Sequence, residues 1–150
     1  MIHTLLATLT LMTSSALIAA SNDNAMPPFL PVPKSVEMHS GKLTLNSSTS
    51  VSMGAGIDKV GKHFIKRLQR GTGWNVKLSK RGTIHLILNK TIGKSPEAYT
   101  IKVGAEGVVI TAASEVGIAR AVETLFQMMP ADVYKESNIQ KISLPHLIVK

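Results

Sequence analysis

The sequence contains no cysteine and few aromatic residues. Its 150 residues include three Phe, two Tyr, one Trp and no Cys. The absence of cysteine excludes disulfide bonds, thiolate metal sites and a cysteine nucleophile, so the folded chain must be held by its apolar core or by a partner domain. The formal net charge of +8 would suit nucleic acid. However, the basic residues are scattered singly or in pairs and few rings are available for base stacking, so we expect a solvated basic surface and no nucleic-acid partner.

The residue patterns of common catalytic and metal sites are missing as well. The nine Asp and Glu residues include no adjacent pair, although glycosidase chemistry needs two poised carboxylates. The chain has no G-x-S-x-G elbow and no H-E-x-x-H spacing. His85 lies between apolar residues of a predicted strand, where we expect it to face solvent. We therefore assign no catalytic, cofactor-binding or metal-ligating residue, and we expect no cofactor.

One segment matches a nucleotide-binding motif in spacing only. Gly56–Lys62 follows the G-x-x-x-x-G-K spacing of a P-loop, but His63 stands where a Ser or Thr hydroxyl must bind Mg²⁺. Gly61 also falls inside a predicted helix rather than in the loop before one. We interpret the segment as a glycine turn that leads into a helix.

The longest uncharged apolar run lies at the N-terminus. Leu5–Ala20 is shorter than the ~20 apolar residues of a membrane span and is interrupted by Thr and Ser. Ala19, Ala20 and Ser21 supply the small residues that a signal peptidase prefers. We therefore predict a signal peptide at 1–21, an extended, proline-rich lead-in at 22–29 and a single domain at 30–150, exported to the periplasm or the extracellular space and without a stable membrane span.

Hydrophobic periodicity predicts two helices among short strands. Strands are expected at 42–45, 49–53, 74–78, 83–88, 98–103, 108–112 and 142–149, and helices at 57–68 and 115–129. The 98–103 and 108–112 strands should form a hairpin, and Pro145 favours an edge position for the last strand. This order predicts an α+β fold, with an antiparallel or mixed sheet and two helices packed on one face.

The second helix should be the main packing element. Ser114 is a suitable N-cap, and Pro130 stops the helical pattern. The apolar face of this helix is predicted to consist of Ile118, Val122, Leu125, Phe126 and Met129. We expect it to cover a sheet surface that includes Ile84, Leu86, Ile101 and Val109, while Glu123 faces solvent.

Three segments resemble a known family. Leu30–Val36 and Gly41–Leu45 resemble the proline-containing opening and first strand of the bacterial hexosaminidase N-terminal domain. Glu97–Ile101, Gly107–Ser114 and Gly117–Pro130 resemble, in order and spacing, that domain's "E-x-Y-x-L", "g-v-x-I-x-A-x-s" and "G-x-x-x-g-x-q-T-L-x-Q-L" motifs. Glu123 stands where Gln is common. Over about 28–150, the chain is therefore similar to the N-terminal, zincin-like α/β domain of β-N-acetylhexosaminidases of glycoside hydrolase family 20.

The resemblance implies a domain without catalysis of its own. In that family a (β/α)₈ barrel follows directly and carries an adjacent Asp-Glu pair, which drives substrate-assisted hydrolysis of terminal N-acetylhexosamine residues. No part of that pair maps onto this sequence. The resemblance thus implies a fragment or truncated product of an exported β-N-acetylhexosaminidase, inactive alone, whose partner is the catalytic barrel. The alternative is a stand-alone exported glycan-binding or interaction module.

The N-terminal pattern makes a direct prediction about processing. When the gene is expressed with an active secretion pathway, the exported protein should begin near Ser21, because the apolar run has the length of a signal-peptide core rather than a membrane span. Intact-mass spectrometry of the exported protein measures the cleavage. Exported protein that retains Met1 would contradict the prediction.

Overall fold

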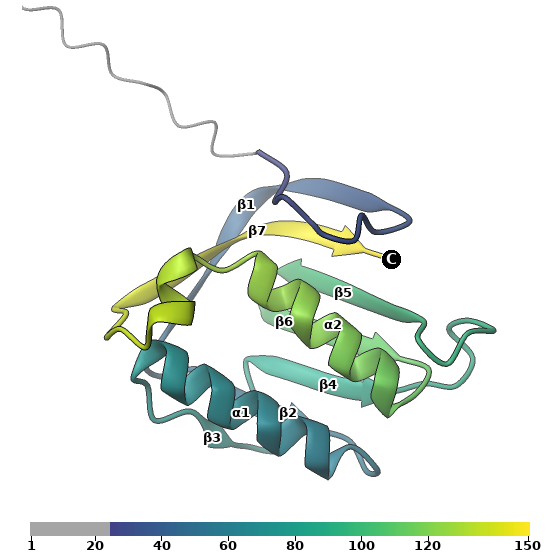
Figure 1. Ribbon diagram of the computed structural model, residues 1–150, viewed down its shortest axis with the longest axis horizontal. Coiled ribbons are helices and arrows are strands. Elements are labelled where there is room, and N and C mark those ends of the chain that lie inside the picture. Colours follow the sequence, from purple (N-terminus) through teal and green to yellow (C-terminus); the bar gives the residue numbers. More distant parts are fainter. Residues whose placement is uncertain (1–24) are drawn as a thin grey trace, which may run out of the picture.

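The computed structural model describes residues 25–150, and the predicted signal peptide at 1–21 lies outside this range. Seven strands form one mixed sheet in the order β1-β7-β5-β6-β4-β2-β3, and both helices lie on one face of it (Figure 1). The predicted fold class is therefore confirmed. The elements are β1 Val36–Asn46, β2 Ser50–Met53, α1 Asp58–Thr72, β3 Lys77–Leu78, β4 Ile84–Leu88, β5 Tyr99–Gly104, β6 Gly107–Ala112, α2 Glu115–Gln127, the 3₁₀ helix η1 Ala131–Lys135, and β7 Lys141–Val149.

Both strand directions occur in the sheet. Strands β3, β2, β4 and β6 run parallel to one another, whereas β5, β7 and β1 join by antiparallel pairing. The expected hairpin is confirmed as β5 and β6, which pair from Tyr99 opposite Ala112 to Gly104 opposite Gly107. Gly107 has a φ of 141°, and a Cβ atom there would collide with the Thr83 carbonyl. Only glycine allows this close approach of β6 to the chain before β4.

Local signals set the helix ends. The Ser114 hydroxyl accepts hydrogen bonds from the backbone N–H groups of Val116 (3.1 Å) and Gly117 (3.3 Å), as expected for an N-cap. Helix α2 ends at Gln127, two residues earlier than predicted. Helix α1 ends where Gly73 adopts a left-handed conformation with a φ of 75°.

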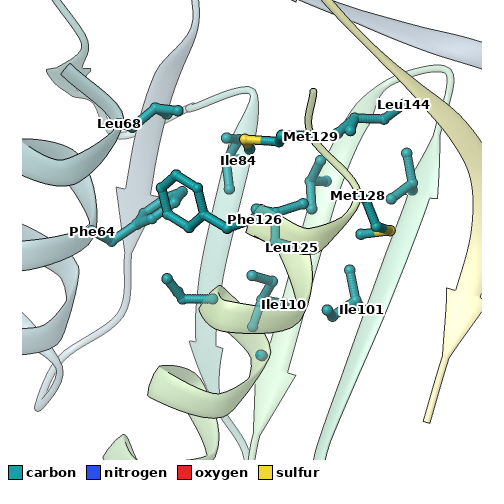
Figure 2. Packing of buried hydrophobic residues seen from close by; sticks show 14 of the residues in the cluster. Phe64, Leu68, Ile84, Ile101, Ile110, Leu125, Phe126, Met128, Met129 and Leu144 are labelled. Carbon is teal, nitrogen blue, oxygen red and sulfur yellow. The ribbon is translucent and has the colours of Figure 1, made fainter. Parts of the chain in front are cut away.

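The core fills the space between the helices and the sheet. Phe64 from α1 and Phe126 from α2 meet edge to face with ring centroids 5.9 Å apart. Around this pair, Leu68 and Leu125 lie over strand residues that include Ile84, Ile101 and Ile110 (Figure 2). All these side chains are fully shielded from solvent, and Met128 and Met129 beside them are also buried. The helices are thus held by the apolar faces that their periodicity predicts.

One predicted core residue lies on the other face of the sheet. Ile84, Leu86 and Ile101 are buried beneath the helices as expected. Val109, however, is aligned with His85 and Lys102, and this row of residues faces away from the helices. Because the Val108–Ile110 run is apolar throughout, alternation along β6 could not reveal which residues face inward.

The prediction that the last strand lies at a sheet edge is wrong. Strand β7 lies between β1 and β5, and β1 forms the edge. Pro145 is nevertheless accommodated, because β5 pairs only with Leu147–Val149 of β7. At Pro145, β7 has β1 as its partner, and β1 is irregular between Met38 and Lys42. Pro145, which has no backbone N–H, therefore lies outside the part of β7 that is hydrogen-bonded to β5.

Substitutions in α2 test this packing. Leu125→Ala should lower the free energy of unfolding by about 2–5 kcal/mol, because the leucine is fully buried and its removal leaves a cavity. Glu123→Ala should cost less than about 1 kcal/mol, since its carboxylate is 58% exposed in a surface ion pair with Arg67. Urea denaturation of both variants measures the difference. Equal losses would show that the helix face is assigned wrongly.

Candidate functional site

The carboxylates of the described residues form no catalytic constellation. Five of them each pair with one Lys or Arg and remain more than half exposed, namely Glu37, Glu97, Glu123, Asp132 and Glu136. Within 25–150, no three His, Asp or Glu side chains gather in a way that could hold a metal ion. Over the same range, no helix is long and apolar enough to cross a membrane.

The segment with P-loop spacing has no phosphate-binding geometry. Gly61 lies in α1, and its N–H donates to the Ile57 carbonyl at 2.9 Å. A P-loop holds phosphate with backbone N–H groups that are free in a loop. The interpretation of Gly56–Lys62 as a turn and helix start is therefore consistent with the structure, and His63 is exposed on the helix.

The fold brings together one Ser–His pair that the sequence did not reveal. The Ser52 hydroxyl and His85 Nδ1 lie 2.7 Å apart on the sheet face away from the helices. Parallel pairing of β2 with β4 places these residues side by side, although 33 positions separate them. In the described part of the chain, no carboxylate hydrogen bonds to His85 to orient its ring. The pair is thus a cross-strand polar contact without the third member of a nucleophilic triad.

The residues behind the family resemblance act as structural braces. The Tyr99 hydroxyl from β5 lies 2.8 Å from the Thr124 hydroxyl of α2. The Gln127 side chain accepts from the Leu30 N–H and donates to the Leu30 carbonyl, each at 2.8 Å. These bonds fasten α2 to the sheet and the lead-in to the end of α2.

A shallow groove lies between α1 and α2 on the helical side. The two helices run side by side (Figure 1), and the groove between their first halves, which is open to solvent, has a volume of about 600 Å³. Beyond it, the Phe64–Phe126 contact and the Arg67–Glu123 ion pair join the helices. The groove is lined by Lys59, Val60, Lys62, His63 and Lys66 of α1 and by Glu115, Val116 and Ala119 of α2.

The groove combines apolar and cationic side chains. Val60 and Ala119 are half-buried, and Val116 is 51% exposed on the side of α2 that also carries the exposed Arg120 and Glu123. The guanidinium of Arg67 is engaged over the Phe126 ring at 4.0 Å and by Glu123. By contrast, Lys59, Lys62 and Lys66 form no ion pair within the described residues. Such a surface suits a protein partner better than a small-molecule reaction.

Comparison with known proteins places these features in a family. The family model described as "Glycosyl hydrolase family 20, domain 2" matches residues 26–149 of this chain. No curated protein sequence matches the chain significantly. An N-acetyl-β-hexosaminidase of Streptomyces plicatus is similar in structure, with 25% identity and a TM-score of 0.71 over 79% of this chain. A GH20 β-N-acetylhexosaminidase of Streptomyces coelicolor A3(2) has 26% identity and a TM-score of 0.70 over 80% of this chain.

The chain spans only a small part of these relatives. It covers 25% of each Streptomyces enzyme. A Vibrio harveyi exo-β-N-acetylglucosaminidase, 24% identical with a TM-score of 0.69, shares the fold over 82% of this chain but only 18% of its own length. The resemblance seen in the sequence is confirmed by the match over nearly all described residues. The chain belongs to glycosyl hydrolase family 20 and corresponds to its domain 2.

Proposed function

We propose that the chain is the non-catalytic N-terminal domain of an exported β-N-acetylhexosaminidase, in which a catalytic barrel removes terminal N-acetylhexosamine residues. The observation that carries the proposal is the match to domain 2 of the family, combined with coverage of 18–25% of the related enzymes. In this arrangement the chain supplies a folded support, and the chemistry belongs to the part of the relatives that it does not cover. Export rests on the apolar run of 1–21.

The described side chains support a role without catalysis. Glycoside hydrolysis needs an acid and a second carboxylate held on either side of the scissile bond. Glu97 is bound by Arg120 at 3.2 Å beside the start of β5, and Glu123 is bound by Arg67 between the helices. Both carboxylates belong to segments that brace α2. Among the described residues each of these carboxylates is paired with an arginine, and this pairing supports a role in the scaffold.

The helical side is the face we assign to the barrel. Val116 at the start of α2 and Tyr134 in η1 are 51% and 56% exposed. Leu30, which Gln127 ties to the end of α2, is 80% exposed. Val116 borders the groove, whereas Tyr134 and Leu30 lie near the other end of α2. Exposed apolar side chains of this kind mark surfaces where another protein packs. A domain docked here would cover all three.

The glycan-binding alternative has less support. Sugar and ligand sites usually contain aromatic side chains placed to contact the ligand. Among the described aromatic residues, Trp74 and the three Phe are buried and Tyr99 is half-buried. Tyr134 is exposed, but its ring lies against Phe126 and near the Arg67 guanidinium. An aromatic platform for a sugar ring is therefore missing from the described surface.

The isolated chain should have no β-N-acetylhexosaminidase activity. The adjacent Asp-Glu pair that drives substrate-assisted hydrolysis in the family is absent from this sequence, so the chain lacks the carboxylates that act on the glycosidic bond. Release of nitrophenol from nitrophenyl N-acetylglucosaminide, compared with buffer, measures this. A preparation of the Glu97→Gln variant controls for contaminating enzyme. Turnover in the parent chain that this substitution abolishes would disprove the scaffold assignment.

The reading frame beyond the codon for Lys150 provides a second test. If the chain is an accessory domain, the frame should continue into a (β/α)₈ barrel with an adjacent Asp-Glu pair, because this chain covers only 18–25% of the length of the related enzymes. Sequencing of the genomic DNA measures this. A stop codon directly after Lys150 would favour the stand-alone interaction module instead.

A further inference from the structure

We infer that the groove between α1 and α2 binds an acidic amphipathic helix on the surface of the domain that this chain serves. The inference rests on the proposed function, since it states the chemistry of the partner surface. It concerns the groove lined by Lys59, Val60, Lys62, His63, Lys66, Glu115, Val116 and Ala119.

The charges around the groove are strongly one-sided. Three lysines and His63 line it from α1, whereas Glu115 is the single carboxylate in the lining. Elsewhere on the helical side, the cations of Arg67, Arg70 and Arg120 are neutralised by ion pairs. Lys59, Lys62 and Lys66 have no such partner in residues 25–150. A partner with carboxylates at this position could therefore form ion pairs with these three lysines.

The floor of the groove adds an apolar contact to this charge. Val60, Val116 and Ala119 lie between the cationic side chains, and they are half-buried or exposed. Burial of such a surface is favourable by about 25 cal/mol per Å² of apolar area. An amphipathic helix satisfies both demands, because its apolar stripe meets the floor while acidic residues on its flanks meet the lysines. A free polyanion would meet the lysines and leave the floor exposed.

The groove lies between two helices that run side by side, and the Phe64–Phe126 contact and the Arg67–Glu123 ion pair join these helices. A third helix placed along two others packs its ridge of side chains into the groove between them. The Ala119 and Val116 side chains are small, so they allow such close approach.

A pair of synthetic helices tests the inference on the intact chain. Two capped 16-residue peptides share leucines at helical spacing; one has Glu and the other Lys at the flanking positions. In NMR titrations at about 0.05 M NaCl, the Glu peptide should bind at least about tenfold more tightly and should shift backbone amide signals of 59–66 and 115–119. The preference should fall severalfold at about 0.5 M NaCl, because salt screens exposed charges.

Matched charge reversals separate the groove from net charge. The double variant Lys59→Glu with Lys66→Glu should weaken binding of the Glu peptide at least about tenfold. The control Lys77→Glu with Lys80→Glu makes the same change of charge at exposed positions in and after β3 and should leave binding within about twofold. Glu115→Gln should strengthen binding about twofold. Thermal melting of each variant verifies that it is folded.

Three results would overturn the inference. The first is equal affinity for the Glu and Lys peptides, and the second is an equal loss in both double variants. The third is a heparin oligosaccharide that shifts the same amides and binds more tightly than the Glu peptide, which would make the groove an anionic-glycan site. These outcomes are independent of the proposed function. A reading frame that continues into a barrel would uphold the accessory role even if the groove bound no acidic helix.

Discussion

Burial of the apolar face of α2 between the sheet and α1 is the interaction on which the rest of the structure depends. Leu125, Ile118 and Phe126 are fully buried, and α2 lies against β4, β5 and β6. Without disulfides, this burial must offset most of the conformational entropy lost on folding. The Phe64–Phe126 contact extends the same core to α1. Both helices are therefore fixed relative to the sheet, and the groove between them has a defined shape.

The polar residues near α2 make this burial specific. The Tyr99–Thr124 hydrogen bond fixes the helix along β5. Two hydrogen bonds between the Gln127 side chain and the Leu30 backbone fix the chain that enters the domain. Gly117 lies against the strand side of the core, where a Cβ would come within 2.8 Å of the Ala98 carbonyl oxygen and 2.9 Å of the Ala112 Cβ. The family motifs thus describe how a helix is seated on a sheet.

A scaffold of this kind can still determine function through its surfaces. The sheet side presents the hydrogen-bonded pair Ser52 and His85 and also the exposed Ile87. The helical side presents exposed apolar residues and lysines that have no internal ion partner. The difference between the two faces follows from the topology, because α1 and α2 lie on the same side and leave the groove between them outward. Function is therefore assigned to the surface of the helix layer rather than to a cavity within the domain.

The sequence by itself determined the two helices, the β5–β6 hairpin and the Ser114 cap, because each depends on local periodicity or on residue types. Strand order, the inward face of β6 and the interior place of β7 were decided by the tertiary structure. The Val108–Ile110 run is apolar on both faces of β6, so its inward face could not be predicted. Pro145 is a local signal for an edge strand, whereas the strands that pair with β7, namely β1 and β5, come from distant parts of the chain. The Ser52–His85 contact and the lysine-lined groove depend on the same long-range pairing. Residues 33 positions apart, or on separate helices, become neighbours only when the sheet and the helix layer assemble, so no local pattern could predict them.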